Sequence, residues 1–237
     1  MRHGPETTNL ADGIDILIWE PNHPGLVDLV RRYQQSLDTP SRRFQLGLKR
    51  SIDIVVAVAC LVLTAIPLAV LVAAIRLESD GPALFRQRRL GRYGRVFDMY
   101  KLRSMLWNSK TEFNPDGSTR VLANDDRLTR IGWFIRRIGI DELPQLLNVI
   151  KGDMSLIGPR PDQDFHLQYY RNGDHRKLAL LPGITSLAQA EGRNALPWQE
   201  RIALEITYVE RFSLWLDFRI ILKTVRIIVT GIGSYNS

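Results

Sequence analysis

The chain has 237 residues, of which 32 are basic and 25 acidic, and 45% are hydrophobic. This length allows one large domain with a real core, and the ordinary hydrophobic content excludes a protein built mainly of transmembrane helices. The net charge of +7 suits nucleic acids, anionic lipid headgroups or phosphorylated substrates and does not choose among them.

The first 44 residues are predicted to form an arm and linker in front of the main domain. Their start lacks the basic-then-apolar pattern of a secretory signal peptide. Residues 25–37 carry apolar side chains at helical spacing, and Pro40 lies in a linker. No motif here carries chemistry, so we predict a docking arm or a loose tail.

An uncharged apolar run covers residues 54–75 and predicts a membrane helix. As an α-helix it would be about 33 Å long, which is enough to cross a bilayer. A buried core helix is the alternative. Its Cys60 is the single cysteine of the chain and cannot form an intrachain disulfide, and no cysteine–histidine cluster indicates zinc.

Basic residues flank both ends of this run. Because positive residues favour the cytoplasmic side of a membrane, we favour a re-entrant helix–break–helix, which returns to its side of entry, over a spanning helix. Pro67 lacks a backbone donor and would provide the bend. Thr64 is placed to hydrogen-bond the backbone groups that the bend frees.

Residues 84–101 form two β-like runs around a glycine-containing turn, which predicts a small β-hairpin. The hairpin holds the densest positive charge in the chain. It is either a solvated basic face or a contact for a nucleotide or for anionic lipid headgroups, and the neighbouring membrane segment favours headgroups. Residues 104–109, which follow it, are predicted to be a short helix.

Asp141 and Glu142 are adjacent acids at the predicted start of a helix that ends at Gly152. Asp141 is therefore a candidate N-cap, which is a purely structural role. A helix N-terminus also favours an ionised carboxylate, and such a carboxylate can attack phosphorus to give an acyl phosphate.

Phosphate oxygens must be neutralised before a carboxylate can approach them. Four basic residues are candidates for this role: Lys101, Arg136, Arg137 and Arg160. A divalent cation held by the two acids would have the same effect. For Arg160 the alternative is an ordinary surface arginine in a proline-braced loop.

The C-terminal part is predicted to be helical over residues 198–212 and 214–229. The second helix is amphipathic and basic, so it either lies on an anionic membrane surface or packs on the core with a solvated face.

Six sequence blocks occur in a fixed order. They are GPALFRQR (81–88), YKLRSM (100–105), DDRLT (125–129), DELPQLL (141–147), GDMSLIGPRP (152–161) and PGIT (182–185). Together, over about residues 44–231, they closely resemble the monotopic phosphoglycosyl transferases, bacterial sugar transferases that load undecaprenyl phosphate.

The resemblance implies an α+β fold: a mainly helical, membrane-associated monotopic domain with one re-entrant helix–break–helix and a small β-hairpin. The expected divisions are an arm and linker (1–44), the membrane helix (45–78) and a catalytic domain with amphipathic interfacial helices (79–237). The expected location is the cytoplasmic face of the bacterial inner membrane.

The resemblance also implies site roles. Asp141 would be the nucleophile, Glu142 would assist it, and the two would hold Mg²⁺. Lys101, Arg136 and Arg160 would bind phosphates. The implied partners are a nucleotide sugar, usually a UDP-sugar, polyprenyl (undecaprenyl) phosphate and anionic lipids, with UMP as a product and no nucleic acid.

Two departures from the family pattern put the membrane break and the donor pocket in doubt. Pro67 follows isoleucine rather than serine, and Ser186 replaces a frequent glycine.

A non-catalytic membrane-attached assembly or regulatory protein is the alternative function. A nucleic-acid binder is suggested by charge alone, without a recognisable motif. The sugar, the glycan pathway and the oligomeric state, a homodimer included, stay open.

Overall fold

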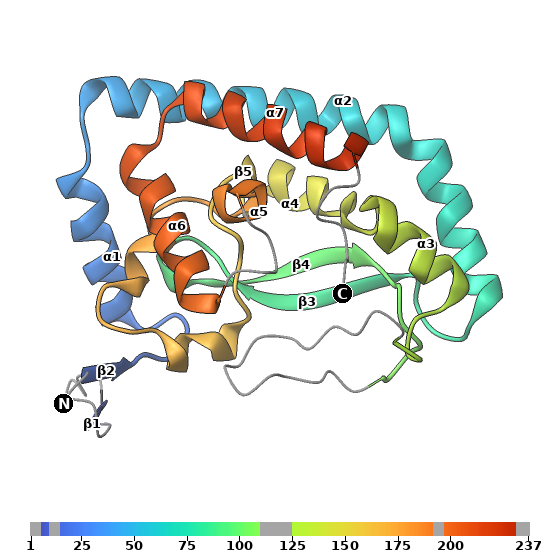
Figure 1. Ribbon diagram of the computed structural model, residues 1–237, viewed down its shortest axis with the longest axis horizontal. Coiled ribbons are helices and arrows are strands. Elements are labelled where there is room, and N and C mark those ends of the chain that lie inside the picture. Colours follow the sequence, from blue (N-terminus) through green and yellow to red (C-terminus); the bar gives the residue numbers. More distant parts are fainter. Residues whose placement is uncertain (1–5, 10–14, 110–124, 192–196, 231–237) are drawn as a thin grey trace.

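The computed structural model describes residues 6–9, 15–109, 125–191 and 197–230 (Figure 1). They form the mainly helical α+β fold that was predicted. The α-helices are α1 (Pro24–Ser36), α2 (Pro40–Glu78), α3 (Arg130–Ile138), α4 (Gln145–Lys151), α5 (Leu187–Glu191), α6 (Trp198–Arg211) and α7 (Leu214–Thr230). The 3₁₀-helices are η1 (Arg92–Gly94), η2 (Ile140–Glu142), η3 (Asp164–Tyr169) and η4 (Asp174–Ala179).

The described strands form three two-stranded sheets. They are β1 (Glu6–Asn9) with β2 (Asp15–Ile18), β3 (Leu84–Leu90) with β4 (Val96–Leu102), and β5 (Ser155–Ile157) with β6 (Gly183–Thr185). The β3–β4 pair is the predicted hairpin and is antiparallel, with Phe85 opposite Lys101 and Arg89 opposite Phe97. Because side chains alternate along a strand, Arg89 and Lys101 project from the same face.

Helix α2 is the longest element and runs along one side of the molecule (Figure 1). Its most apolar stretch has a mean hydropathy of 2.9, and only 6% of that stretch is buried within the protein. Val62, Leu63 and Ile66 are 70–79% exposed. An exposed apolar surface of this kind is typical of a contact with a membrane or with another protein. By length and composition this helix could cross a membrane.

The predicted break at Pro67 is a bend within a continuous helix, because helical structure runs through it from Pro40 to Glu78. Figure 1 shows α2 turning toward α3 in its C-terminal part. Thr64 donates to the carbonyl of Cys60 at 2.6 Å. Pro67 has no N–H, and the carbonyl that therefore lacks its helical hydrogen bond is that of Leu63. Thr64 does not replace this bond. Its own bond to the carbonyl four residues earlier favours bending of the helix at that turn.

The region of residues 1–44 contains α1, which packs into the largest hydrophobic cluster. Leu26 and Val30 are fully buried there with residues of η3, η4 and α6. The turn of the β3–β4 hairpin is also close, because Gly94 has φ +74° and a Cβ on it would lie 2.5 Å from Leu26. The expected boundary at residue 45 falls inside α2, since this helix begins at Pro40.

Residues 104–109 form turns and a bridge instead of the predicted helix. The amide of Leu106 donates to Arg127, and the carbonyl of Ser104 accepts from Thr129. Backbone groups that a helix would pair internally are therefore paired with the segment before α3.

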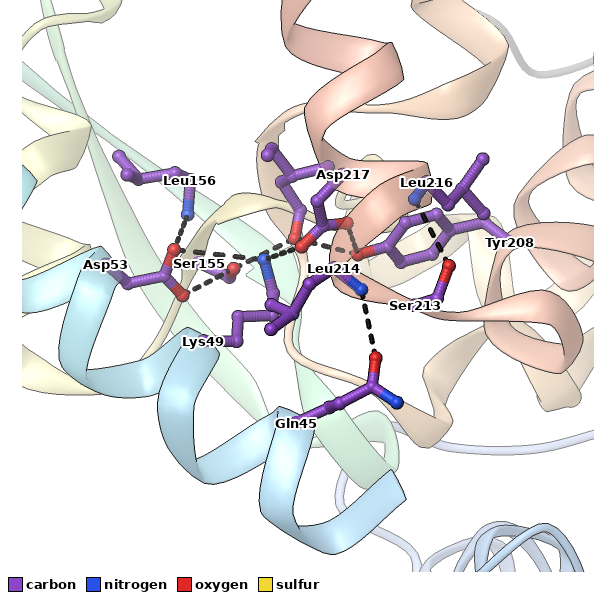
Figure 2. Close-up of polar contacts among 11 residues, drawn as sticks. Gln45, Lys49, Asp53, Ser155, Leu156, Tyr208, Ser213, Leu214, Leu216 and Asp217 are labelled. Carbon is purple, nitrogen blue, oxygen red and sulfur yellow. Dashed lines mark hydrogen bonds and ion pairs between the residues drawn. The ribbon is translucent and has the colours of Figure 1, made fainter. Parts of the chain in front are cut away.

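A buried polar network ties the start of α2 to β5, α6 and α7 (Figure 2). Lys49 lies 2.7 Å from Asp217 and 3.8 Å from Asp53. Asp53 accepts from the hydroxyl of Ser155 at 2.7 Å, and Asp217 accepts from the hydroxyl of Tyr208 at 2.7 Å. The network holds the long helix in one position against the body that carries the site.

The other end of α2 is also fastened. The guanidinium of Arg103, which follows β4, donates to the carbonyls of Ile75, Ser79 and Asp80. Glu78 accepts from the amide of Ile131 at the start of α3. The strand that carries Lys101 is thus joined to the C-terminal end of the apolar helix.

Candidate active site

Asp141 and Glu142 lie in the short turn η2 between α3 and α4. Gly139 ends α3 with φ +75°, a left-handed conformation that glycine adopts readily. The N-cap of α4 is Pro144, which has no side-chain capping bond. The prediction of Asp141 as an N-cap is therefore wrong, because the 3₁₀ turn places it three residues before that cap.

Glu142 is held by two cations. Its Oε1 lies 2.8 Å from the ammonium of Lys101 on β4 and 3.5 Å from the guanidinium of Arg160. Burial works to raise the pKa of Glu142, but attraction to Lys101 and Arg160 outweighs it and lowers that pKa to about 2. Glu142 is therefore a fixed negative charge at neutral pH.

Asp141 is the contrasting acid of the pair. It is 7% exposed, and among the described residues its carboxylate has no hydrogen bond and no ion pair within 4 Å. Burial raises its pKa, Lys101 opposes that rise, and the neighbouring charge of Glu142 adds to it. Burial thus opposes the ionised form that the predicted helix terminus would have favoured. A desolvated carboxylate without a partner is a good nucleophile once ionised.

Arg160 is presented by the loop that follows β5. A Cβ on Gly158 would collide with the carbonyl oxygen of Leu181, so only glycine allows this close approach of two backbone segments. The amide of Gly183 donates to the carbonyl of Pro159 at 2.9 Å. Two prolines and this bond set the direction of the loop, and its Arg160 side chain is 41% exposed.

Arg136 lies in the last turn of α3. Its charge lowers the pKa of Asp141, which places it within electrostatic reach. It forms no ion pair with Asp141 or Glu142 in the described part of the chain. The structure therefore brings Lys101, Arg160 and Glu142 into contact and keeps Arg136 at a greater distance.

A small pocket opens beside the acid pair and contains about 190 Å³ of empty space. It is lined by Arg89, Met99, Lys101, Glu142, Gln145, Arg160 and Pro161. Three cations and one carboxylate among these lining residues suit a phosphate group of a substrate. Asp141 lies beside these lining residues rather than among them.

Sequence reasoning missed Arg89 and Gln145 as residues of this pocket. The signal for Arg89 was the two-residue period of the hairpin, because Arg89 shares a strand face with Lys101 once the register is known. For Gln145, three residues after Glu142, no comparable signal existed, since its burial depends on the fold of η2 and α4.

The acid pair has the chemistry of a magnesium site that the substrate completes. No group of three or more Asp, Glu, His or Cys side chains able to hold a metal occurs within the described ranges. Mg²⁺ commonly uses one or two carboxylates together with substrate phosphates. Asp141 has no ion pair with another described residue, and the ion pairs of Glu142 with Lys101 and Arg160 both use Oε1, so the donors present fit such a site.

The family model described as bacterial sugar transferase matches residues 44–231. An uncharacterized sugar transferase of Bacillus subtilis is 39% identical over 186 residues, which are 78% of this chain and 89% of that protein. The UDP-glucose:undecaprenyl-phosphate glucose-1-phosphate transferase of Caulobacter vibrioides is 42% identical over 205 residues, 83% of this chain and 75% of that protein.

A third relative is the undecaprenyl-phosphate galactose phosphotransferase of Salmonella typhimurium, which is 37% identical over 218 residues. These are 87% of this chain but 45% of that protein. The chain thus spans most of the length of the first two relatives and less than half of the third. The matched family region contains every site residue from Arg89 to Arg160, whereas α1 lies outside it.

Proposed function

This chain belongs to the bacterial sugar transferase family and is a sugar-phosphate transferase, and we propose that it moves a sugar-1-phosphate from a nucleotide sugar to undecaprenyl phosphate. The donor is a UDP-sugar and the product enters polysaccharide synthesis. The observation that carries the proposal is the split between the two acids: Glu142 is paired with cations, and Asp141 is buried with no direct partner among the described residues.

In the first half of the proposed reaction, a carboxylate oxygen of Asp141 attacks the β-phosphorus of the donor. A phosphorus–oxygen bond forms to Asp141, the bond from that phosphorus to the bridging oxygen breaks, and UMP leaves with that oxygen. Lys101 and Arg160 lie beside the acid pair and neutralise the phosphate oxygens. Because the leaving group is a phosphate, charge stabilisation matters more than proton donation.

In the second half, an oxygen of undecaprenyl phosphate attacks the same phosphorus. The bond from phosphorus to Asp141 breaks, the carboxylate is regenerated, and the product is an undecaprenyl diphosphate sugar. The first half exchanges a phosphoanhydride bond for an acyl phosphate bond and the second half does the reverse, so one set of cations serves both steps. Glu142 keeps Lys101 and Arg160 directed at the pocket throughout.

Magnesium is part of the proposal, with Asp141 and Glu142 as the residues that would hold it. A bound Mg²⁺ would supply positive charge to the diphosphate oxygens. Arg136 would contribute more weakly, through its electrostatic effect on Asp141.

The proposed membrane attachment follows from the exposed apolar surface of α2. We propose that α2 enters the membrane from the cytoplasmic face and returns to it at the bend near Pro67. α7 would lie at the same interface, because it exposes a row of large apolar side chains: Trp215, Phe218, Ile221, Leu222 and Val225.

Labelling tests this topology. In a chain whose Cys60 is replaced by serine, single cysteines at Ser41 and Leu77, near the two ends of α2, should both react with a membrane-impermeant reagent from the cytoplasmic side only. Pro67→Leu should straighten the helix and move one end to the outer side. Labelling of the two ends from opposite sides in the unaltered helix would establish a spanning topology instead.

UMP release tests the activity. The purified protein is incubated with Mg²⁺, undecaprenyl phosphate and a panel of UDP-sugars, and UMP and the lipid product are measured. Without the lipid, the donor should leave a phosphosugar adduct on Asp141 that mass spectrometry locates. If no donor releases UMP, the chain is a non-catalytic member of its family.

A further inference from the structure

Arg89, on the edge of the pocket, stands out among the residues that the proposed reaction does not yet use. It lies on β3 and lines the pocket with Lys101, Glu142 and Arg160. Its neighbour Arg88 projects from the opposite face of the same strand, is 65% exposed and pairs with Asp164 at 3.2 Å. Two adjacent arginines therefore have different surroundings.

Each terminal nitrogen of the Arg89 guanidinium is held by one hydrogen bond. One terminal nitrogen donates to the carbonyl of Pro161 at 3.1 Å, and the other donates to the side chain of Gln87 at 2.7 Å. The Nε atom is buried and has no hydrogen-bond partner. A guanidinium has five N–H groups, so Arg89 keeps N–H donors beyond the two hydrogen bonds that it makes with other described residues.

The charges that line the pocket do not balance. Arg89, Lys101 and Arg160 are three cations, and Glu142 is the single anion among the lining residues. Burial lowers the pKa of Arg89 to about 10, and repulsion from Arg160 contributes to this shift. Two like charges held near one pocket are unfavourable unless an anion joins them.

The acids elsewhere around Arg89 already have cations of their own. Asp162 lies 2.5 Å from Lys177 and also accepts from the hydroxyl of Tyr170. Asp164 is paired with Arg88. Neither acid supplies the missing negative charge of the pocket.

We infer that Arg89 is a further phosphate-binding residue, which joins Lys101 and Arg160 in holding the diphosphate of the nucleotide sugar. A guanidinium presents several parallel donors and matches phosphate oxygens better than an ammonium does. Its bond to Pro161 also ties it to the loop that carries Arg160, so both arginines meet one ligand together. The inference rests on the proposed function and adds a residue to its donor site.

Inorganic pyrophosphate provides a test that does not depend on turnover. Thermal unfolding of the full-length protein in detergent is followed with and without pyrophosphate, for wild type, Arg89→Met, Arg89→Lys and the matched control Arg88→Met. A ligand that binds only the folded state raises the unfolding temperature. We expect wild type and Arg88→Met to be stabilised alike, Arg89→Lys less, and Arg89→Met hardly at all.

The kinetic arm uses UMP release from a UDP-sugar. Loss of one donor to a transition-state oxyanion lowers kcat by about 10²- to 10³-fold in a known case, and we expect about a 10²-fold fall in kcat/KM for Arg89→Met. Arg88→Met should stay within about twofold of wild type, because it lies away from the pocket.

Two results would overturn the inference. One is equal stabilisation by pyrophosphate of Arg89→Met and Arg88→Met, even if Arg89→Met unfolds at a lower temperature without ligand, because Arg89 would then only brace the loop. The other is a wild-type protein that releases UMP but gains no stability from pyrophosphate. If pyrophosphate binds through Arg89 and no UDP-sugar releases UMP, the proposed function fails, and Arg89 is a phosphate-binding residue of a site with another ligand.

Discussion

The network around Lys49 and the acid pair of η2 both remove carboxylates from water, but they treat those carboxylates differently. In the network, both oxygens of Asp53 and both oxygens of Asp217 have a partner. In the acid pair, Glu142 attracts two cations while the buried carboxylate of Asp141 has no direct partner within the described structure.

The difference separates stability from chemistry. A buried charge is tolerated when it has hydrogen-bond partners and an opposite charge. The Lys49 network meets this condition, so it holds α2 in place, and its carboxylate oxygens are already engaged. The site around Asp141 leaves both a nucleophile and surplus positive charge unmatched. Such unsatisfied groups lower stability and are typical of functional sites.

Asp141→Asn should have the largest effect on activity and almost none on stability. Activity, measured as UMP release, should fall by on the order of 10⁴-fold or more, because an amide cannot form the aspartyl phosphate. The thermal unfolding temperature should stay equal to that of wild type or rise, since a neutral side chain replaces a desolvated charge. Activity above about a hundredth of wild type would exclude Asp141 as the nucleophile.

Lys49→Met should have the opposite effect in the other cluster. Removal of one partner from a buried charge group costs about 3–5 kcal/mol, and here it leaves Asp53 and Asp217 without their cation. The free energy of unfolding in detergent should fall by that amount. Arg43→Met is the matched control on the same helix; its ion pair with Asp38 is exposed and should contribute at most about 1 kcal/mol. Equal losses in both variants would contradict a structural role for the network.

Much of the fold was predictable because periodicity and motif order report local structure. The hairpin, α1, α6 and α7 were predicted from residue spacing, and DELPQLL with the GPRP loop marked the acid pair and Arg160. The prediction of a helix at residues 104–109 was wrong because the backbone of these residues pairs with a segment farther along the chain, Arg127 to Thr129. No local sequence pattern reveals that pairing.

The environment of each site residue could not be predicted in the same way. Whether Asp141 caps a helix or is buried in a 3₁₀ turn depends on how Gly139 ends α3 and how α4 packs. The place of Arg89 depends on strand register, and the Lys49 network joins four elements far apart in the chain. Charge and residue type were visible in the sequence, but partners were not.

Glu142→Gln sharpens the contrast inside the acid pair. The amide loses the attraction of Lys101 and Arg160, so the free energy of unfolding should fall by about 1–3 kcal/mol. UMP release should fall about 10²-fold, because the two cations lose the group that orients them. The isosteric changes at neighbouring positions should therefore shift stability in opposite directions. A Glu142→Gln protein as stable as Asp141→Asn would mean that Glu142 does not organise these cations.

The smallest effect is the pH dependence, and its sign differs between the two acids. The pKa of Asp141 lies above its usual 3.8 because of burial, so its ionised form costs stability, and the stability present below pH 3.8 is lost as pH rises through the raised pKa. Glu142 has its pKa lowered from 4.5 to about 2, so it adds stability above pH 4.5 that is lost as pH falls toward 2.

The pH dependence of activity should follow the ionisation of Asp141, since Glu142, whose pKa is about 2, stays ionised over most of the acidic range. We expect kcat/KM to fall about tenfold per pH unit below the raised pKa of Asp141, or about 1.4 kcal/mol per unit, as one proton occupies the nucleophile. In Glu142→Gln the fall should begin at lower pH, because the neighbouring negative charge that raises the pKa of Asp141 is gone. A profile of kcat/KM that keeps the wild-type midpoint in Glu142→Gln would show that the two acids do not interact in the free enzyme.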